Sequence, residues 1–515
     1  MQRSRFTVRS GLAASVIAAA FSLSVASETS AQELRPGRIR AAILADVNDF
    51  DPMSFLAVNF PVIKNLYDSL IEYTPDGRAI PNLAESWTIA PDNRSVTLTL
   101  RADIKFHGGA ALDAEAVSAT LRKAADPRAG KQVYPTMAIV QDWTVIDPRT
   151  IRITFKNAAP TRQITDLLQF ISVIDPAGIE TVTTRPAGTG PYVLAERAVG
   201  QRVRLEANRA HWRANQPLSP EVVLTVFEND AAAAAALESG AVDLVYGALG
   251  RTAVRLRGAG YQVVEGPGPL VQVFRINSTR GPFRNQTFRQ AFNYLLDRAS
   301  ILRVGYAGLG EVTALPWAPT SPAHDPSYAQ RYAYDLEKAR ALIRQSGLSQ
   351  AEINSWRLLV NGGDEALVRI SQIAQASFAR VGMNIELDLR QGAEFNESML
   401  TGKFDAMFAG IGNIQKFPTR LTTNSIYRTV NNPVLGEPHP HPEYVEAIRR
   451  VDTTIGSEAE VKAAYDNLNR VLVETAFAVP TNSYPVGLIV ASPRLGGFTL
   501  DMDNMLVART LGFRP

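Results

Sequence analysis

The feature that most constrains the fold of this chain is the alternation of strand and helix signals along its length. A strand pattern over residues 39–45 is followed by apolar residues at helical spacing over residues 58–70. Polar and apolar residues alternate over 95–100 and again over 150–155, which predicts two half-buried strands. Residues 113–124, between those strands, have a helical pattern. The alternation predicts an α/β fold.

Length and composition set the scale of the fold. At about 150 residues per domain, the chain is long enough for roughly three structural units. With 46% hydrophobic and 20% charged residues, it has the composition of an ordinary globular protein. The one biased tract is an alanine run at 231–236, which follows Asp230, a good helix cap, and precedes Gly240. We expect a short packing helix there.

Short sequence phrases, many with glycine or aromatic residues, occur in a fixed order over residues 40–410. They are Asp51-Pro52, NLYDSL at 65–70, Asp76-Gly77, PNLAESW at 81–87, KFHGG at 105–109, GTGPYV at 188–193, NRAHW at 208–212, GAVDL at 240–244, PFR at 282–284, RQAFNY at 289–294, Asp297-Arg298 and YDLEKA at 334–339. Their order resembles the extracellular solute-binding proteins of family 5, the peptide- and nickel-binding receptors that feed ABC importers. One departure is Gly108, where the family more often has Asp.

The resemblance implies a two-lobed α/β periplasmic-binding-protein fold of the large, cluster-C-like type, with a hinged ligand cleft. The first lobe would hold residues 32–273 and 481–515, with an extra subdomain inserted at about 75–205. The second lobe would hold residues 274–480. We place the hinge at 266–269 and 480–485, where glycine and proline fit crossing points. Ordinary surface turns are the alternative interpretation of these two segments.

The amino-terminal residues have the pattern of an export signal. Arginines at positions 3, 5 and 9 precede an apolar run at 11–25 and the small residues Thr29-Ser30-Ala31, which predicts cleavage after Ala31. The run is shorter than the roughly 20 residues that a membrane helix needs. The chain has no cysteine, which excludes disulfides, thiolate catalysis and a lipidated cysteine anchor. We therefore expect a soluble protein of the periplasm.

Charge and motif content exclude several functions. Removing residues 1–31 takes away three arginines and Glu28, so the formal charge falls from +3 to +1, which offers no basis for binding nucleic acid or an anionic membrane. The sequence lacks a Gly-x-Ser-x-Gly elbow, a His-Glu-x-x-His pair and a phosphate-binding Gly-Lys-Ser/Thr loop. Gly188-x-Gly190 and Gly308-x-Gly310 lack the third glycine of a dinucleotide site. We predict no enzymatic activity and no cofactor.

The histidines cluster only at residues 439–443, which read His-Pro-His-Pro-Glu. Two imidazoles and a carboxylate can bind Ni²⁺, Cu²⁺ or Zn²⁺. The alternating prolines favour an extended exposed loop instead, so we predict no metal site here.

The ligand loop of the family is expected after residues 404–410, which resemble the strand that delivers it into the cleft. Peptide-binding members continue with Trp, then an Asp that pairs with the α-ammonium of the peptide, then Asp-Pro. This chain has Ile411, Ile414 and Phe417-Pro418 in that frame, so the peptide-amine clamp is not carried over.

Hydrogen-bond donors dominate the loop of this chain instead. The candidate ligand-binding residues are Asn413, Gln415, Lys416, Arg420 and Asn424. Arginine can hold a carboxylate with two charge-assisted hydrogen bonds, and lysine adds a point charge. We therefore expect a small anionic ligand, such as an acidic peptide, an opine-like amino acid conjugate or a metal chelate with carboxylates. The alternative is that Lys416 and Arg420 point outward to water.

On the opposing lobe, Asn48, Phe50 and Phe55 follow the first predicted strand, where the family's first lobe faces its cleft. The rings of Phe50 and Phe55 can stack on a ligand, although core packing is an equal alternative for both phenylalanines. Tyr67, Trp87 and Trp143 fall within helix or strand patterns and are expected in the core or at a lobe interface.

The expected function is that of a periplasmic receptor that delivers a small solute to an inner-membrane ABC permease by closing its cleft. Three alternatives stay open: a binder of a nickel-type metal chelate, a periplasmic chaperone or signalling receptor on the same fold, and a secreted hydrolase, which lacks an identifiable nucleophile. The resemblance implies a monomer, and the sequence has no coiled-coil heptad that would argue for a helix-paired oligomer.

Overall fold

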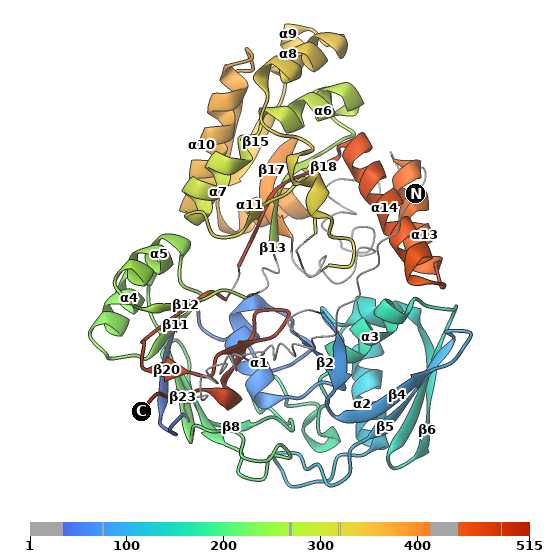
Figure 1. Ribbon diagram of the computed structural model, residues 1–515, viewed down its shortest axis with the longest axis vertical. Coiled ribbons are helices and arrows are strands. Elements are labelled where there is room, and N and C mark those ends of the chain that lie inside the picture. The colour runs from blue at the N-terminus through green and yellow to red at the C-terminus, as the bar shows by residue number, and fades with distance from the viewer. Residues whose placement is uncertain are drawn as a thin grey trace, which may run out of the picture.

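Two separate β-sheets organise the protein, whose computed structural model describes residues 34–74, 77–266, 270–317, 319, 321–411, 441–485 and 487–515. Each sheet is the centre of one lobe (Figure 1). Lobe I, the lower lobe in Figure 1, has a seven-stranded sheet in the order β12 (Gln262–Val264), β19 (Ile489–Ala491), β11 (Leu244–Tyr246), β1 (Ile39–Ile43), β10 (Glu221–Val226), β9 (Arg202–Ala207), β8 (Tyr192–Ala198). Lobe II has a six-stranded sheet in the order β14 (Glu311–Val312), β18 (Ala478–Tyr484), β13 (Leu270–Ile276), β17 (Ala406–Ile411), β15 (Arg357–Asn361), β16 (Glu386–Arg390). The predicted two-lobed α/β fold is confirmed.

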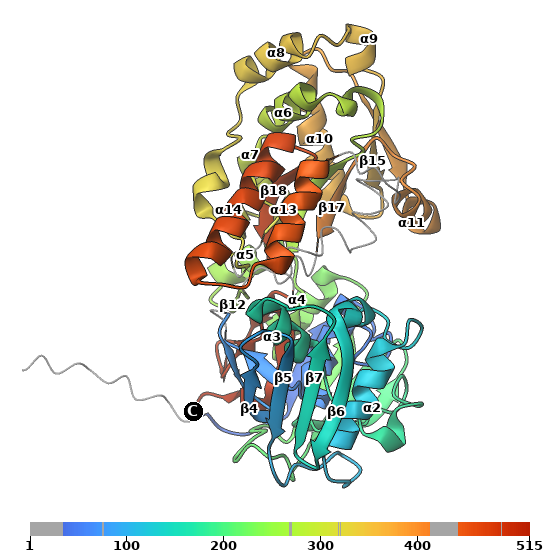
Figure 2. The ribbon, with the colours of Figure 1, turned by 90° about the vertical axis from the view of Figure 1, so that its right-hand side faces the viewer.

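A four-stranded antiparallel sheet forms a separate layer in lobe I. Its strands lie in the order β4 (Ala84–Ile89), β5 (Ser95–Leu100), β7 (Thr150–Phe155) and β6 (Val140–Asp147). Helix α2 (Ala114–Ala125) covers one of its faces (Figure 2). Strands β8 and β9, which the predicted subdomain range of 75–205 includes almost entirely, pair within the seven-stranded sheet instead.

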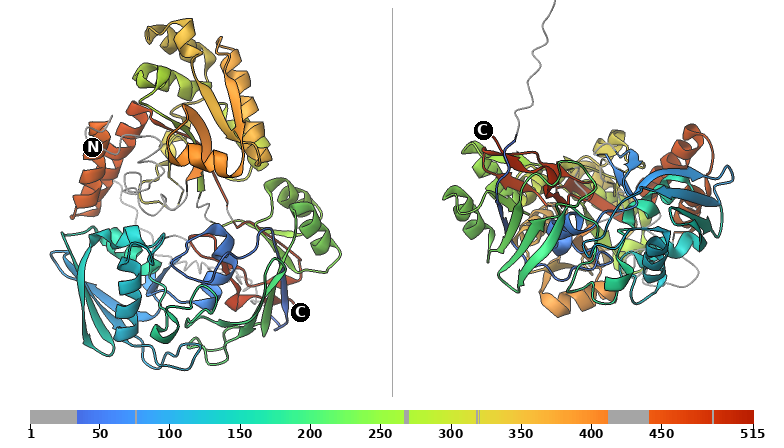
Figure 3. Two further views of the ribbon diagram at one scale, coloured as in Figure 1. Left: turned by 180° about the vertical axis from the view of Figure 1, so that it is seen from behind. Right: turned by 90° about the horizontal axis from the view of Figure 1, so that it is seen from below.

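The helices flank the sheets on both lobes. In lobe I, α1 (Phe60–Leu66) and α3 (Thr161–Phe170) lie on the side nearest lobe II, and α4 (Asp230–Glu238) and α5 (Gly250–Gly258) lie at the opposite flank from the four-stranded sheet (Figures 1 and 3). The helices of lobe II are α6 (Gln286–Leu295), α7 (Arg298–Tyr306), α8 (Leu336–Gln345), α9 (Gln350–Ile353), α10 (Glu365–Ala379), α11 (Gly392–Leu400), α13 (Pro442–Thr453) and α14 (Glu458–Thr475). The pair α13 and α14 lies above α3 in Figures 1 and 2.

The chain changes sheet twice within the described residues. It leaves the lobe I sheet after β12 and enters the lobe II sheet at β13, and it returns from β18 to β19. Strands β13 and β18 pair with each other, with Val273 opposite Pro480. The two crossings therefore lie side by side, which is the arrangement that lets two lobes move about a shared hinge.

Local sequence accounts for the element boundaries. Helix α2 begins where predicted, because the Asp113 carboxylate accepts the Ala116 amide at 2.9 Å. The helix predicted over 58–70 is shorter, since α1 ends at Leu66 and Tyr67 adopts an extended backbone with φ −133° and ψ 148°. The alanine helix α4 is capped by Asn229, so the predicted cap at Asp230 is wrong. The Asp230 carboxylate instead accepts hydrogen bonds from the Leu249 amide and the Thr252 hydroxyl.

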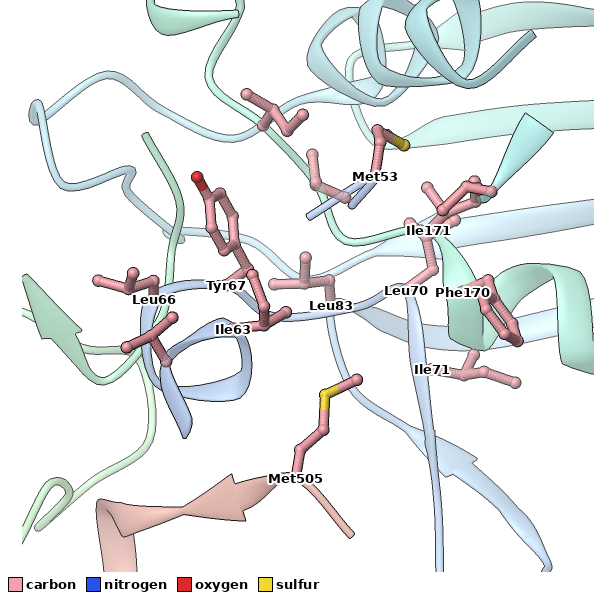
Figure 4. Close-up of a cluster of buried hydrophobic side chains, with 14 of the residues drawn as sticks. Met53, Ile63, Leu66, Tyr67, Leu70, Ile71, Leu83, Phe170, Ile171 and Met505 are labelled. Atoms are coloured by element: carbon pink, nitrogen blue, oxygen red, sulfur yellow. The ribbon is translucent and has the colours of Figure 1, made fainter. Parts of the chain in front are cut away.

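The core of lobe I forms around α1. Ile63 and Leu66 of α1 and Tyr67, which follows it, belong to the same cluster of buried side chains as Leu83 and Met505 (Figure 4). The carboxyl-terminal segment of the chain thus supports the first helix. Because α1 lies at the edge of lobe I that faces lobe II, this packing fixes the surface on which a site between the lobes is built.

The core of lobe II is rich in aromatic rings. Phe274 of β13 lies edge-to-face with Phe292 of α6 at 4.6 Å and with Phe408 of β17 at 4.5 Å between ring centroids. Trp356 and Phe378 extend the cluster with centroid distances of 5.7 and 5.0 Å to Phe292. Such pairs add about 0.5–1.5 kcal/mol each beyond their buried area, so β13 and β17 are held firmly in place. None of the described helices has the length and apolar character that a membrane span requires.

Candidate functional site

The junction of the two lobes contains a tight turn of the carboxyl-terminal segment at residues 501–504. Tyr246, the last residue of β11, donates its hydroxyl to the Asn504 carbonyl at 2.7 Å. Asn504 is fully buried with a φ of +57°. A Cβ on Gly266 would overlap the Asn504 side chain, and one on Gly487 would lie 2.6 Å from its carbonyl oxygen. Asn504 is therefore enclosed between the two crossing segments.

Polar side chains from distant parts of the sequence gather around this turn. The Lys64 ammonium of α1 lies 3.8 Å from the Asp501 carboxylate. The Gln169 side chain of α3 donates to the Asp503 carboxylate at 3.4 Å. We call the set Lys64, Gln169, Tyr246, Asp501, Asp503 and Asn504 the junction cluster. Open α/β sheets bind ligands beyond the carboxyl ends of their strands, and the cluster lies beyond the carboxyl end of β11.

The junction cluster contains ionisable side chains that are largely buried. The side chains of Lys64 and Asp501 are 7% and 15% exposed, and Asp503 is 1% exposed. Burial raises the pKa of Tyr246 well above its ordinary value, and the negative charges of Asp501 and Asp503 raise it further. Tyr246 is thus a neutral hydrogen-bond donor.

Lobe II contributes an aromatic pair at the crossing. The Tyr306 ring of α7 stacks on Tyr484 of β18 with 4.5 Å between centroids, and its hydroxyl donates to the Gln272 amide oxygen at 2.8 Å. Burial raises the pKa of both tyrosines, so both hydroxyls stay neutral. The amide nitrogen of Gln272 is buried without a hydrogen-bond partner among the described residues. A buried donor of this kind gains from a ligand acceptor or a water.

Strand β17 leads toward this junction. Its last residue, Ile411, pairs with Val271 near the start of β13, where the chain has just entered lobe II. The Arg275 guanidinium holds the neighbouring Gly410 carbonyl at 2.9 Å. The predicted ligand loop follows Ile411. Its candidate residues Asn413, Gln415, Lys416, Arg420 and Asn424 lie outside the described residues and stay predictions.

The three candidates in lobe I lie on the loop after β1. Asn48 is exposed, and its backbone amide donates to the Asn59 side chain at 2.9 Å. Phe50 is 2% exposed and belongs to the hydrophobic core. Phe55 is half-buried, with its ring 5.0 Å from both Phe60 and Phe170. The structure therefore brings Phe55 to α3 and places the Phe50 ring among core side chains.

A buried ionic network fixes the loop that carries these residues. Asp51, 1% exposed, lies 3.4 Å from the Lys123 ammonium of α2 and 3.1 Å from that of Lys131. The Asp51 carboxylate also accepts the Met53 amide at 3.0 Å, which closes a local turn at Asp51-Pro52. The network connects the loop to the four-stranded subdomain through α2.

The histidine cluster differs from its prediction. The predicted exposed loop is wrong at His441, which is 5% exposed, immediately precedes α13 and stacks on Phe477 with 4.8 Å between ring centroids. Its ring nitrogen lies 3.0 Å from the Ser278 hydroxyl. Packing against an aromatic ring outweighed the tendency of the prolines to stay extended. Within the described residues, no group of three or more metal-binding side chains comes together.

The members of the junction cluster are residues that sequence reasoning missed. A local signal for them existed, because Asp501 and Asp503 alternate with apolar residues in a short stretch and Lys64 interrupts an apolar helix. Nothing in the sequence connects these segments, since Gln169 and Asp503 are 334 residues apart.

Comparisons with known proteins agree with this architecture. Residues 78–431 match the bacterial extracellular solute-binding proteins, family 5 (middle part). Heme-binding protein A of Haemophilus influenzae is 26% identical over 377 residues, which are 67% of this chain and 69% of that protein. Glutathione-binding protein GsiB of Salmonella paratyphi A is 27% identical over 333 residues, 63% of this chain and 64% of that protein. The crystal structure of NikA from Brucella suis in complex with Fe(III)-EDTA has a TM-score of 0.81 at 22% identity, covering 92% of this chain and 99% of that one.

Proposed function

The chain belongs to the bacterial extracellular solute-binding proteins of family 5, and we propose that it is the receptor through which an ABC importer takes up a small carboxylate-bearing ligand. The observation that carries the proposal is the junction cluster, a set of buried polar side chains enclosed by the two segments that join the lobes. The cluster brings charged and polar side chains to the carboxyl end of a strand at the lobe junction, which is where open α/β sheets bind ligands.

The charges of the site define the ligand class. Asp501 and Asp503 of lobe I favour a positive group on the ligand, and the predicted donors Lys416 and Arg420 favour carboxylates. A peptide-like or opine-like zwitterion satisfies both sides. Glutathione, the ligand named for one relative, has this chemistry. A metal chelate built on carboxylates belongs to the same class and is the second candidate ligand.

Closure of the two lobes is the proposed mechanism. The lobes are joined by two adjacent segments, so they can rotate toward each other about one hinge. A ligand with a micromolar dissociation constant supplies about −8 kcal/mol of binding free energy, which exceeds an open-state preference of a few kcal/mol. The closed form then docks on an inner-membrane permease. The protein acts in the periplasm as a monomer and performs no chemistry on its ligand.

Ligand identification is the first experiment. Mass spectrometry of small molecules released from protein purified from its native host identifies the bound compound. Isothermal titration of that compound into Asp503→Asn and Arg420→Ala should each give at least tenfold weaker binding, the loss expected for one charge-assisted contact. Glu180→Gln, at an exposed position of lobe I outside the junction cluster, is the matched control. Unchanged affinity in both site variants would contradict the proposed ligand class.

Closure has its own measurement. X-ray scattering of the protein should show a smaller radius of gyration when the compound is added, and Glu180→Gln should behave like wild type. Superimposable curves with a saturating ligand would contradict the closure mechanism while leaving binding itself intact.

A further inference from the structure

A second polar pocket lies in lobe II, away from the junction. It has a volume of about 390 Å³ and is lined by Ser278, Thr279, Arg284, Gln286, Arg289, His441 and Glu443. These residues follow the far end of β13, whose first residue, Leu270, is at the junction. Seven residues of strand span roughly 20 Å, so the pocket is not part of the junction site.

The pocket receives one nitrogen of a buried guanidinium. Arg289 is 3% exposed. Its Nε donates to the Thr475 carbonyl at 2.8 Å, and its Nη1 donates to the carbonyls of Phe283 and Arg284 at 2.8 and 3.1 Å. Its Nη2 donates no hydrogen bond within the described part of the chain. Because the other two nitrogens are directed at carbonyls, Nη2 is the part of the guanidinium that faces the pocket.

The buried charge of Arg289 forms no salt bridge with a carboxylate among the described residues. Burial lowers its pKa to about 10, and the negative charge of Glu443 at the pocket partly offsets this. Arg298, one helix further on, is a useful contrast. Its Nε, Nη1 and Nη2 are all hydrogen-bonded, to Pro480, to Asn293 and Tyr332, and to the Asn293 side chain. Arg298 is a structural arginine, whereas Arg289 keeps unused donors.

Other groups at the pocket reinforce its positive potential. Arg284 is an exposed residue that lines the pocket, and its Nε donates to the Thr279 carbonyl at 2.7 Å. Helix α6 begins at Gln286 and helix α13 begins at Pro442, next to His441, so two helix amino termini meet here. Helix amino termini favour anions. Among the described residues that line the pocket, Glu443 is the one acid, and it is exposed.

We propose that this pocket binds a phosphate or sulfate oxyanion, through Arg289 Nη2 and Arg284, at a site separate from the ligand cleft. A tetrahedral oxyanion matches the unused guanidinium donors and supplies a negative charge that can hydrogen-bond to the buried arginine directly. Glu443 competes with the anion for the same positive groups. Loading the site would tie η4 (Gly281–Arg284) to the first turns of α6 and α13.

Isothermal titration of the full-length mature protein with inorganic phosphate, at constant ionic strength, tests the site. Wild type should bind in the millimolar range or tighter. Arg284→Gln should bind about tenfold more weakly, the loss of one charge-assisted hydrogen bond, and Glu443→Gln should bind severalfold more tightly. Glu446→Gln, on the same helix and paired with Arg449, is the matched control and should not change the affinity.

Two further arms complete the test. Glycerol phosphate in place of inorganic phosphate distinguishes a free oxyanion from a phosphate group on a larger molecule. If the pocket has no room for the glycerol group, inorganic phosphate should bind and glycerol phosphate should not. Arg289→Lys keeps the positive charge but loses the paired N–H donors of the guanidinium. It should therefore abolish phosphate binding while circular dichroism shows a folded protein. Absence of phosphate binding to wild type, or equal affinities for Arg284→Gln and Glu446→Gln, would overturn the proposal.

Discussion

Trp212 donates its indole N–H to the buried Asp68 carboxylate at 3.1 Å across 144 residues of sequence. The same carboxylate accepts the Thr189 hydroxyl at 2.9 Å, and the His211 imidazole lies 3.6 Å away. Asp68, Thr189 and Trp212 each come from a different one of the short phrases that mark the family. The three phrases thus meet in a single buried polar contact of lobe I, which lies just after the end of α1.

Replacing Asp68 should destabilise the protein in a pH-dependent way. Burial opposes ionisation of Asp68, but the His211 imidazole and the Trp212 hydrogen bond outweigh it and hold the pKa of Asp68 well below its ordinary value. A depressed carboxyl pKa stabilises the fold above the unfolded pKa of about 3.9, and this stabilisation is lost as the pH falls. Asp68→Asn should therefore lower the free energy of unfolding by about 2 kcal/mol at pH 7.

Urea unfolding at pH 7 and at pH 4 measures this effect. The difference between wild type and Asp68→Asn should shrink at the lower pH, because wild type then loses part of the same contribution. Glu180→Gln, which is exposed, should match wild type at both values. A difference that does not depend on pH would show that the charge of Asp68 is not what stabilises the contact.

A glycine phrase next to the same contact should tolerate no side chain. A Cβ on Gly190 would lie 2.4 Å from the Leu66 carbonyl carbon and 2.6 Å from the Tyr67 amide. These are backbone atoms at the end of α1 and cannot move aside. Gly190→Ala should lower the unfolding free energy by about 3 kcal/mol.

Gly258 at the end of α5 supplies the control, because a Cβ added there would meet no heavy atom within 4 Å. Alanine there should be neutral or stabilise by up to about 1 kcal/mol. Chemical denaturation of both variants makes the comparison. Equal effects at the two positions would contradict the close approach of Gly190 to α1.

These contacts explain how far the sequence predicts the fold. Strands β5 and β7 are predictable from the alternation of polar and apolar residues. The family phrases indicate two lobes because these phrases lie where segments distant in the sequence come into contact. Helix α1 is shorter than its apolar periodicity suggests, since Tyr67 leaves the helix to donate its hydroxyl to the Phe50 carbonyl at 2.9 Å. Tertiary hydrogen bonding of this kind overrides local propensity.

The site was less predictable than the fold. Periodicity and phrases describe single segments, whereas Lys64, Gln169 and Asp503 become neighbours only when α1, α3 and the carboxyl-terminal turn are packed together. Phe50 shows the opposite error, in which a residue proposed for the site from the sequence lies in the core. It stands at a cleft-facing position in the sequence but is buried, because a strand-to-helix loop can direct an aromatic ring into the core as readily as into a cleft.

Asp452 on α13 should weaken the protein at neutral pH. Burial raises its pKa to about 7, and its Oδ1 is buried without a hydrogen-bond partner among the described residues. A raised carboxyl pKa penalises the fold increasingly as the pH rises from the unfolded value of about 3.9 toward 7. Asp452→Asn should therefore raise the unfolding free energy by about 2 kcal/mol at pH 8 and by much less at pH 4.

Thermal or urea unfolding at the two pH values checks the sign. Asp466→Asn, which removes an exposed pair with Lys462, should change stability by less than about 0.5 kcal/mol at either pH. A variant at Asp452 that is less stable than wild type at pH 8 would show that its carboxylate has a favourable partner when ionised.

Gly487 at the hinge and Gly200 away from it have nearly the same backbone φ angle, so they make a matched pair for mutation. Gly487, on the segment that returns from β18 to β19, has a φ of +70°, and Gly200, in the turn between β8 and β9, has a φ of +72°. A Cβ at Gly200 meets no atom within 4 Å, whereas one at Gly487 would lie 2.5 Å from the Tyr246 hydroxyl and 2.6 Å from the Asn504 carbonyl oxygen.

Alanine at either position costs about 1–2 kcal/mol for the left-handed backbone. Only Gly487→Ala also pushes the crossing segment away from Tyr246 and Asn504, where the junction cluster lies, so only this variant should alter closure. We expect its ligand affinity to fall at least tenfold and its scattering curve with ligand to stay close to that of the free protein, while Gly200→Ala closes like wild type. Equal affinities in the two variants would mean that the lobes rotate about a point other than this crossing.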